Sequence, residues 1–145
     1  YLIDSISETR LEKAFIEHTH WDLKKGTPYV IGCSTELEQL IESEQIHKGI
    51  TATAGGFYGP QGRVLRLGIQ DSALNSKMDS FSFEGHRITN LEMETSAIYG
   101  LGKLLGHHCL SMNAIIANRA NGTFSQDPYK AVDELILYTL NKLAQ

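Results

Sequence analysis

Residues 87–117, RITNLEMETSAIYGLGKLLGHHCLSMNAIIA, decide the fold class. Arg87–Met93 has the composition of a strand, and the following Glu94–Leu105 segment repeats apolar side chains at helical spacing. Gly106 is suited to the left-handed position just after a helix. Cys109–Ala117 is then hydrophobic on both faces, which is typical of a buried central strand. A strand, a helix and a second strand in this order predict an α/β fold.

The flanking sequence continues the alternation of helices and strands, with no linker or repeat, so residues 1–145 are expected to form a single α/β unit. The further elements we predict are an amphipathic helix through Leu11, Ala14, Phe15 and His18, a buried strand over Pro28–Cys33, a helix opened by a Thr35/Glu38 capping box, a strand over Lys48–Ala54, a short helix over Ser72–Phe81, and a terminal helix that begins at Asp127-Pro128.

Composition excludes several classes of protein. Thirteen Lys and Arg against seventeen Asp and Glu give a net charge of −4, which argues against a nucleic-acid partner. No apolar run approaches the roughly 18 residues that cross a bilayer, and no signal peptide opens the chain, so no membrane partner is expected. Cys33 and Cys109 lie in apolar runs, which favours reduced core thiols of a cytoplasmic protein over a disulfide.

The loop Gly55–Arg63, GGFYGPQGR, has a composition that packing alone does not require. Its glycines let the backbone approach a ligand closely. Gln61 offers one acceptor and two donors, Arg63 offers a planar fork of donors, and Phe57 offers a flat apolar wall. Together they could recognise the carbonyl and N–H edge of a planar heterocycle. A surface turn with a solvated arginine is the alternative that the sequence leaves open.

Glu92-Met93-Glu94 ends one predicted strand and opens the next helix. Carboxylates at the carboxyl end of a strand lie where open α/β sheets usually bind ligands. One of these carboxylates could accept hydrogen bonds from the hydroxyls of a sugar, with Met93 as an apolar floor. Glu94 could instead cap the helix or interact with its dipole, and both alternatives remain open.

Other residues that could bind a metal or take part in catalysis give weaker signals. None of the six histidines has a companion at a metal-ligand spacing, so no metal is expected. The sequence has no G-x-S-x-G elbow, no P-loop and no G-x-G-x-x-G. Asn118-Arg119 follows the predicted central strand, either as the rim of a binding site or simply as the exit of that strand.

Three motifs follow one another along the chain. GITATA at 49–54 leads into FYGPQGR at 57–63, NLEMETSA occupies 90–97, and AIIANR occupies 114–119. Their order and spacing resemble the uridine phosphorylase branch of the nucleoside phosphorylase family, from about Cys33 to the C-terminus. The resemblance implies a mixed central sheet flanked by helices, and it assigns these 145 residues to the C-terminal part of that fold.

The resemblance also implies roles for side chains at the base. Gln61 and Arg63 would bind the carbonyl and N–H edge of uracil and act catalytically by stabilising the leaving base. Phe57 would pack on the base or the ribose. Ile116 and Ala117 would line the base pocket.

At the ribose, the resemblance implies that Met93 packs under the sugar, that Glu94 binds its hydroxyls, and that Glu92 supports the site. Purine-preferring relatives have a Ser-Asp pair after the strand that follows, where this chain has Asn118-Arg119. This difference from the purine-preferring relatives favours a pyrimidine base.

The reaction implied is phosphorolysis of uridine to uracil and ribose 1-phosphate, with inorganic phosphate as co-substrate, no cofactor, and a homo-oligomeric enzyme. The family's Gly-Asp-Pro phosphate turn does not occur here, residue 91 is Leu where relatives often have an aromatic, and the chain begins Tyr1-Leu2 without Met. We therefore expect a trimmed chain that is catalytically incomplete alone. The alternatives are a nucleosidase that uses water and a non-catalytic nucleoside-binding module.

Overall fold

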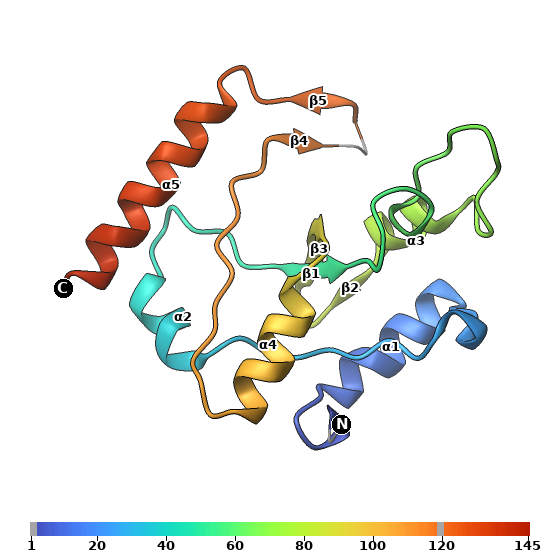
Figure 1. The fold of residues 1–145 in the computed structure, drawn as a ribbon, viewed down its shortest axis with the longest axis horizontal. Coiled ribbons are helices and arrows are strands. Elements are labelled where there is room, and N and C mark those ends of the chain that lie inside the picture. The colour runs from blue at the N-terminus through green and yellow to red at the C-terminus, as the bar shows by residue number, and fades with distance from the viewer. Residues whose placement is uncertain (1–2, 119–120) are drawn as a thin grey trace.

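A small mixed sheet forms the centre of the computed structural model, which describes residues 3–118 and 121–145 (Figure 1). Strand β1 (Ile50–Thr53) runs parallel to β3 (His86–Glu92), and β2 (Ser82–Phe83) pairs antiparallel with the other edge of β3. The order in the sheet is β1-β3-β2. Both β1 and β3 were predicted from the sequence, and the α/β class with a mixed sheet is confirmed.

Five α-helices lie around this sheet in the described chain, and a separate hairpin precedes the last of them (Figure 1). Their bounds are α1 Thr9–Thr19, α2 Thr35–Ile41, α3 Leu74–Ser80, α4 Thr95–Leu104 and α5 Pro128–Leu143, with short 3₁₀ turns at Ile3–Ser5, Leu23–Lys25 and Gly59–Gln61, and a hairpin of β4 (Ala117–Asn118) and β5 (Thr123–Phe124).

Local sequence signals account for most of the helix ends. Gly106 adopts a φ of 77° just after α4, as predicted. The Asp127 carboxylate accepts the Lys130 N–H at 3.0 Å and so caps α5, with Pro128 in its first turn. The predicted Thr35/Glu38 capping box is wrong by one residue, because the Ser34 hydroxyl accepts the Leu37 N–H instead.

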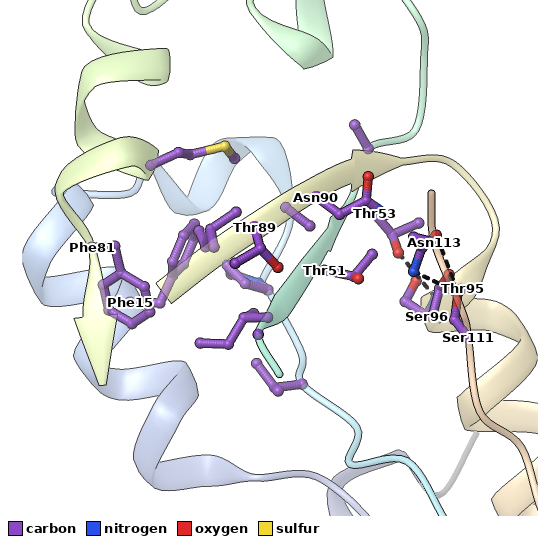
Figure 2. A pocket seen from close by; sticks show the side chains of 18 of the residues that line it. Phe15, Thr51, Thr53, Phe81, Thr89, Asn90, Thr95, Ser96, Ser111 and Asn113 are labelled. Atoms are coloured by element: carbon purple, nitrogen blue, oxygen red, sulfur yellow. Dashed lines mark hydrogen bonds between the residues drawn. The ribbon is translucent and has the colours of Figure 1, made fainter. Parts of the chain in front are cut away.

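The core is a small cluster where α1 and α3 pack on the sheet. Phe15 from α1 meets Phe81, the C-cap residue that follows α3, edge-to-face with ring centroids 5.4 Å apart (Figure 2). Leu74 and Met78 from α3 complete the buried cluster. Ile88 and Leu91 of β3 pack against this cluster, and the polar residues described below follow at the carboxyl end of the strand.

Two predicted strands do not form. Residues 28–33 and 109–116 run as irregular chain, and of the predicted Cys109–Ala117 strand only Ala117 lies in a strand, β4. The reason is that side chains and loops meet their backbone groups: the Glu12 carboxylate accepts the Val30 N–H at 2.9 Å, and the Tyr99 hydroxyl accepts the Ser111 N–H at 2.7 Å. A strand needs a continuous neighbouring backbone, and neither segment has one within the described chain.

Cys33 and Cys109 are both free thiols, and each is half-buried rather than in the core. Partial burial raises the pKa of the Cys33 thiol. No helix in the described ranges combines the length and apolar character needed to cross a membrane.

Candidate functional site

The parallel pairing of β1 with β3 brings two of the predicted motifs to one edge of the sheet. Thr53, the last residue of β1, lies opposite Glu92, the last residue of β3. The Ala54 N–H continues the ladder by donating to the Glu92 carbonyl at 2.9 Å. Because the carboxyl ends of parallel strands meet at the same edge, the Gly55–Arg63 loop and the Met93-Glu94 pair leave the sheet side by side.

The loop after β1 is folded tightly on itself. The Tyr58 carbonyl accepts the N–H groups of Gln61 and Arg63, at 3.1 Å and 3.0 Å. Gly62 adopts a φ of 73°, and a Cβ placed there would lie 2.2 Å from Oδ1 of Asn75. Both the left-handed backbone and the close contact require glycine at this position.

Arg63 is held by this loop rather than solvated, in contrast to the alternative that the sequence left open. Its Nη1 donates to the Phe57 carbonyl and to Oε1 of Gln61, the latter at 2.6 Å. The guanidinium carbon lies 3.6 Å from the centroid of the Phe57 ring, a cation–π contact. Gln61 is only 3% exposed, whereas half of Phe57 is accessible. A charged donor fork is thus fixed between a buried amide and an accessible ring.

The donors of Arg63 are not all used by the loop. Both hydrogen bonds from the guanidinium to described residues come from Nη1, so Nη2 and Nε have no partner within residues 3–118 and 121–145. These N–H groups are available to the carbonyl groups of a planar ligand.

Glu92 is fully engaged by the protein. Oε2 accepts the backbone N–H groups of Glu94 and Thr95, each at 2.7 Å, and Oε1 accepts the hydroxyl of Thr53. Partial burial acts to raise the pKa of Glu92, but the hydrogen bonds from Thr53 and from the two backbone amides outweigh it, and the pKa lies below its usual range. Glu92 is therefore an ionised carboxylate that joins the end of β3 to the start of α4.

Thr53 is a site residue that the sequence analysis missed. Its hydroxyl donates to Glu92 and accepts the Ser96 N–H at 3.0 Å, so it ties both strands to the first turn of α4. The only signal was a hydroxyl at the end of the predicted strand 48–54, and its partner became visible only with the register of β1 and β3.

Glu94 contrasts with Glu92. It occupies the N-cap position of α4, but its side chain makes no capping hydrogen bond. Among the described residues, its Oε2 accepts only the neighbouring Met93 N–H, at 3.3 Å, and both residues are exposed. The structure thus assigns the capping of α4 to Glu92 and Thr53, and it leaves the Glu94 carboxylate accessible beside the Gly55–Arg63 loop.

The remaining predicted site residues are placed elsewhere. Ile116 and Ala117 are exposed, Ala117 pairs with Phe124 in the β4–β5 hairpin, and the Ile116 carbonyl accepts the Ser125 N–H at 2.9 Å. Figure 1 shows this hairpin apart from the edge formed by β1 and β3. Asn118 belongs to the same hairpin, and Arg119 lies outside the described residues.

Comparisons with known proteins identify the family of the chain. A family model described as the phosphorylase superfamily matches residues 6–143. The chain belongs to this superfamily. Among solved structures it is similar to a nucleoside phosphorylase from Trypanosoma brucei that shows uridine phosphorylase activity, with 25% sequence identity and a TM-score of 0.77. The match covers 94% of this chain and 49% of the trypanosome chain, so the chain spans about half the length of that phosphorylase.

A comparison with curated proteins finds no significant match. Within the described parts of the chain, no group of three or more His, Cys, Asp or Glu side chains is placed to hold a metal ion.

Proposed function

We propose that this chain carries the base- and ribose-binding part of a phosphorylase that converts uridine and inorganic phosphate reversibly to uracil and ribose 1-phosphate. One observation carries the proposal: the Gln61–Arg63 donors and the Glu94 carboxylate leave adjacent parallel strands at the same edge of the sheet. A ligand with a planar heterocycle at one end and vicinal hydroxyls at the other could use both kinds of group. Membership of the phosphorylase superfamily supports it independently.

The base end of the site would act mainly in the transition state. A phosphate oxygen bonds to the anomeric carbon as the bond from that carbon to the uracil nitrogen breaks, and the electron pair leaves with uracil. Negative charge then grows on the uracil carbonyls, where the unused N–H groups of Arg63 can donate. Losing one such donor typically costs about 2.7–4 kcal/mol of transition-state stabilisation.

Gln61 and Phe57 would position the guanidinium of Arg63. The amide oxygen of Gln61 accepts from Nη1 of Arg63, and the Phe57 ring covers one face of the guanidinium. Because Arg63 is fixed before the ligand arrives, binding requires little further loss of side-chain conformational entropy. The exposed half of Phe57 would pack against the nucleoside.

The ribose end would use Glu94 and Met93. Glu94 is exposed and makes a single weak hydrogen bond to the part of the chain that the structure describes, so its carboxylate could accept two hydroxyls of a ribose. Met93, 41% exposed, would supply the apolar floor beneath the sugar. The cytoplasmic location, the homo-oligomeric assembly, the pyrimidine preference and the roles of Ile116 and Ala117 stay predictions.

Uracil release from uridine by this chain, with and without phosphate, tests the reaction. We expect uracil binding but no release by the chain alone, because no phosphate-binding motif was found in it. Phosphate-dependent release would show a complete site in these 145 residues. Release without phosphate would contradict phosphorolysis and favour a nucleosidase.

Uracil binding, measured by calorimetry, tests the assignment of the loop. Arg63→Ala should weaken binding at least about tenfold, as expected for the loss of charge-assisted hydrogen bonds. Arg10→Ala is the matched control, because Arg10 is an exposed arginine whose ion pair with Glu84 lies on the surface. Equal uracil affinity in both variants would show that the base does not bind at this loop.

A further inference from the structure

The turn between β4 and β5 contains a dipeptide that can react with itself. Asn121 is followed by Gly122, and this is the one Asn-Gly pair in the sequence. Both residues are exposed, and their hairpin lies apart from the central sheet (Figure 1). The side-chain amide of an asparagine can be attacked by the backbone nitrogen of the next residue, and glycine, which has no Cβ, hinders that approach least.

Gly122 leaves this approach open. It has a φ of 68°, and a Cβ placed there would meet nothing within 4 Å beyond its two chain neighbours. No described residue accepts the Gly122 N–H. A backbone amide inside a helix or a strand ladder is held by its hydrogen bond, whereas this one is able to turn toward a neighbouring side chain.

Thr123 orients the side chain of Asn121. Oδ1 of Asn121 accepts the backbone N–H of Thr123 at 3.1 Å and the Thr123 hydroxyl at 2.6 Å. A backbone N–H can only donate, so the atom that faces it is the side-chain oxygen of Asn121 and not the nitrogen. These two contacts fold the side chain of Asn121 back along the peptide that joins it to Gly122.

The same two donors favour the chemistry. When a nitrogen adds to the side-chain carbonyl carbon of Asn121, negative charge develops on Oδ1, where both donors of Thr123 already point. Donors fixed at the position of a developing oxyanion stabilise the transition state. Thr123 therefore provides a small oxyanion hole for the side chain of Asn121.

Other asparagines of the described chain lack this combination. Asn75, Asn90 and Asn141 lie within α3, β3 and α5, where regular structure fixes the backbone that would have to turn. Asn113 lies in irregular chain, but Ala114 follows it. Oδ1 of Asn113 accepts only a hydroxyl among the described residues, at 3.4 Å. Asn113 is thus a reference within the same molecule.

We propose that Asn121 is a site of spontaneous deamidation, promoted by Gly122 and Thr123. The backbone nitrogen of Gly122 gives its proton to solvent and bonds to the side-chain carbonyl carbon of Asn121. The bond from that carbon to Nδ2 then breaks, and Nδ2 takes a proton from solvent and leaves as ammonia, so that a succinimide ring remains. Water opens the ring at one of its two carbonyls and leaves aspartate or isoaspartate. The reaction consumes one water and releases one ammonia.

The product would change the hairpin. An isoaspartate continues the chain through its side-chain carbon, which adds one atom to the backbone of the turn and places a carboxylate there. β4 and β5 pair over only two residues each. A hairpin this short is marginally stable, so a longer turn should open it. Deamidation would thus be a slow, one-way change in the segment before α5, and it does not depend on the proposed substrate.

Peptide mapping by mass spectrometry follows the reaction in the purified 145-residue chain during storage at mildly alkaline pH. The mass of the fragment that contains Asn121 should rise by the difference between an NH₂ and an OH group, with isoaspartate among the products. The reference is a synthetic peptide of residues 115–126, which has the same sequence without the fixed turn.

We expect Asn121 to react about tenfold faster in the folded chain than in the peptide, because the donors of Thr123 are held in place only in the folded chain. Asn113 should stay unmodified over the same time. A rate in the folded chain equal to or below that of the peptide, or equally fast modification of Asn113, would overturn the proposal.

Thr123→Val separates the effect of the donors from that of the Asn-Gly sequence. Valine keeps the branched shape and the backbone N–H of threonine but lacks the hydroxyl that donates to Oδ1. The rate in the folded chain should fall at least about threefold, and the rate in the peptide should not change. Thr139→Val is the matched control, because the Thr139 hydroxyl donates to the Leu135 carbonyl within α5. An unchanged rate in folded Thr123→Val, or an equal fall in the peptide, would also contradict the role of Thr123.

Discussion

Replacing Glu92 with glutamine should destabilise the fold, whereas the same change at Glu94, two residues on, should leave stability intact and weaken nucleoside binding. The two side chains lie at the same junction between β3 and α4, but the protein uses them differently. Glu92 receives three hydrogen bonds from the protein, and Glu94 receives one at 3.3 Å.

The magnitude follows from the hydrogen bonds lost. A hydrogen bond to a charged group contributes about 1.5–3 kcal/mol. Glutamine at 92 keeps one oxygen acceptor, but its NH₂ group replaces the other carboxylate oxygen. At least one hydrogen-bond donor that Glu92 now accepts would then face another donor. Partial exposure lets water replace some of this loss, so we expect a decrease of about 2–4 kcal/mol in the free energy of unfolding. For Glu94→Gln we expect less than about 0.5 kcal/mol, as for ordinary surface substitutions.

Urea unfolding followed by far-UV circular dichroism at neutral pH measures the difference. With a slope of about 2 kcal/mol per molar urea, the middle of the range for a small domain, Glu92→Gln should lower the midpoint by about 1–2 M and Glu94→Gln should barely move it. Equal midpoints for the two variants, or a larger loss for Glu94→Gln, would refute the assignment of Glu92 as the residue that joins β3 to α4.

Three further perturbations test the same account. Because the pKa of Glu92 is lowered from its usual 4.5, its contribution to stability is present above that pH and is lost as the pH falls through the folded-state pKa, so urea midpoints should fall less steeply with acid in Glu92→Gln than in the native chain. Gly62→Ala should weaken uracil binding in calorimetry, because a left-handed alanine costs about 1–3 kcal/mol and its Cβ would strike Asn75; Gly85→Ala, with similar φ and open space around it, is the control that should leave binding unchanged. Asp127→Ala should lower the unfolding free energy by about 1 kcal/mol, through loss of the α5 cap, with no change in uracil affinity; an unaltered urea midpoint would contradict this.

Local signals in the sequence predicted what depends on neighbours in the chain. The helix stop at Gly106 and the start at Asp127-Pro128 both formed as expected, because each requires only residues within one turn. The strands β1 and β3 were predicted from composition, and their parallel pairing follows the α/β pattern.

The misplaced strands depend on groups distant in sequence. Residues 28–33 and 109–116 have the hydrophobicity of buried strands, but a strand forms only where another backbone pairs with it, and hydrophobicity does not reveal that partner. The shift of the α2 cap from Thr35 to Ser34 is a local competition between adjacent hydroxyls that composition cannot resolve.

The candidate site was likewise predicted only in part from the sequence. Gln61, Arg63 and Glu94 were singled out by residue type and motif, and the register of β1 with β3 brings the segments that follow the two strands to one edge of the sheet. Thr53 was missed because its role is to connect β1, Glu92 and α4, which are contiguous only in space. Ile116 and Ala117 were assigned from the resemblance alone, and their roles at the base stay predictions.

Calorimetric titration of the chain with uridine and with uracil tests most directly whether one nucleoside site joins the Gln61–Arg63 loop to Glu94. The account predicts that Arg63→Ala lowers the affinity for both ligands, and that Glu94→Gln lowers the affinity for uridine by about tenfold while uracil, which lacks the ribose, binds unchanged. Equal effects of Glu94→Gln on the two ligands, or none on either, would contradict the shared site.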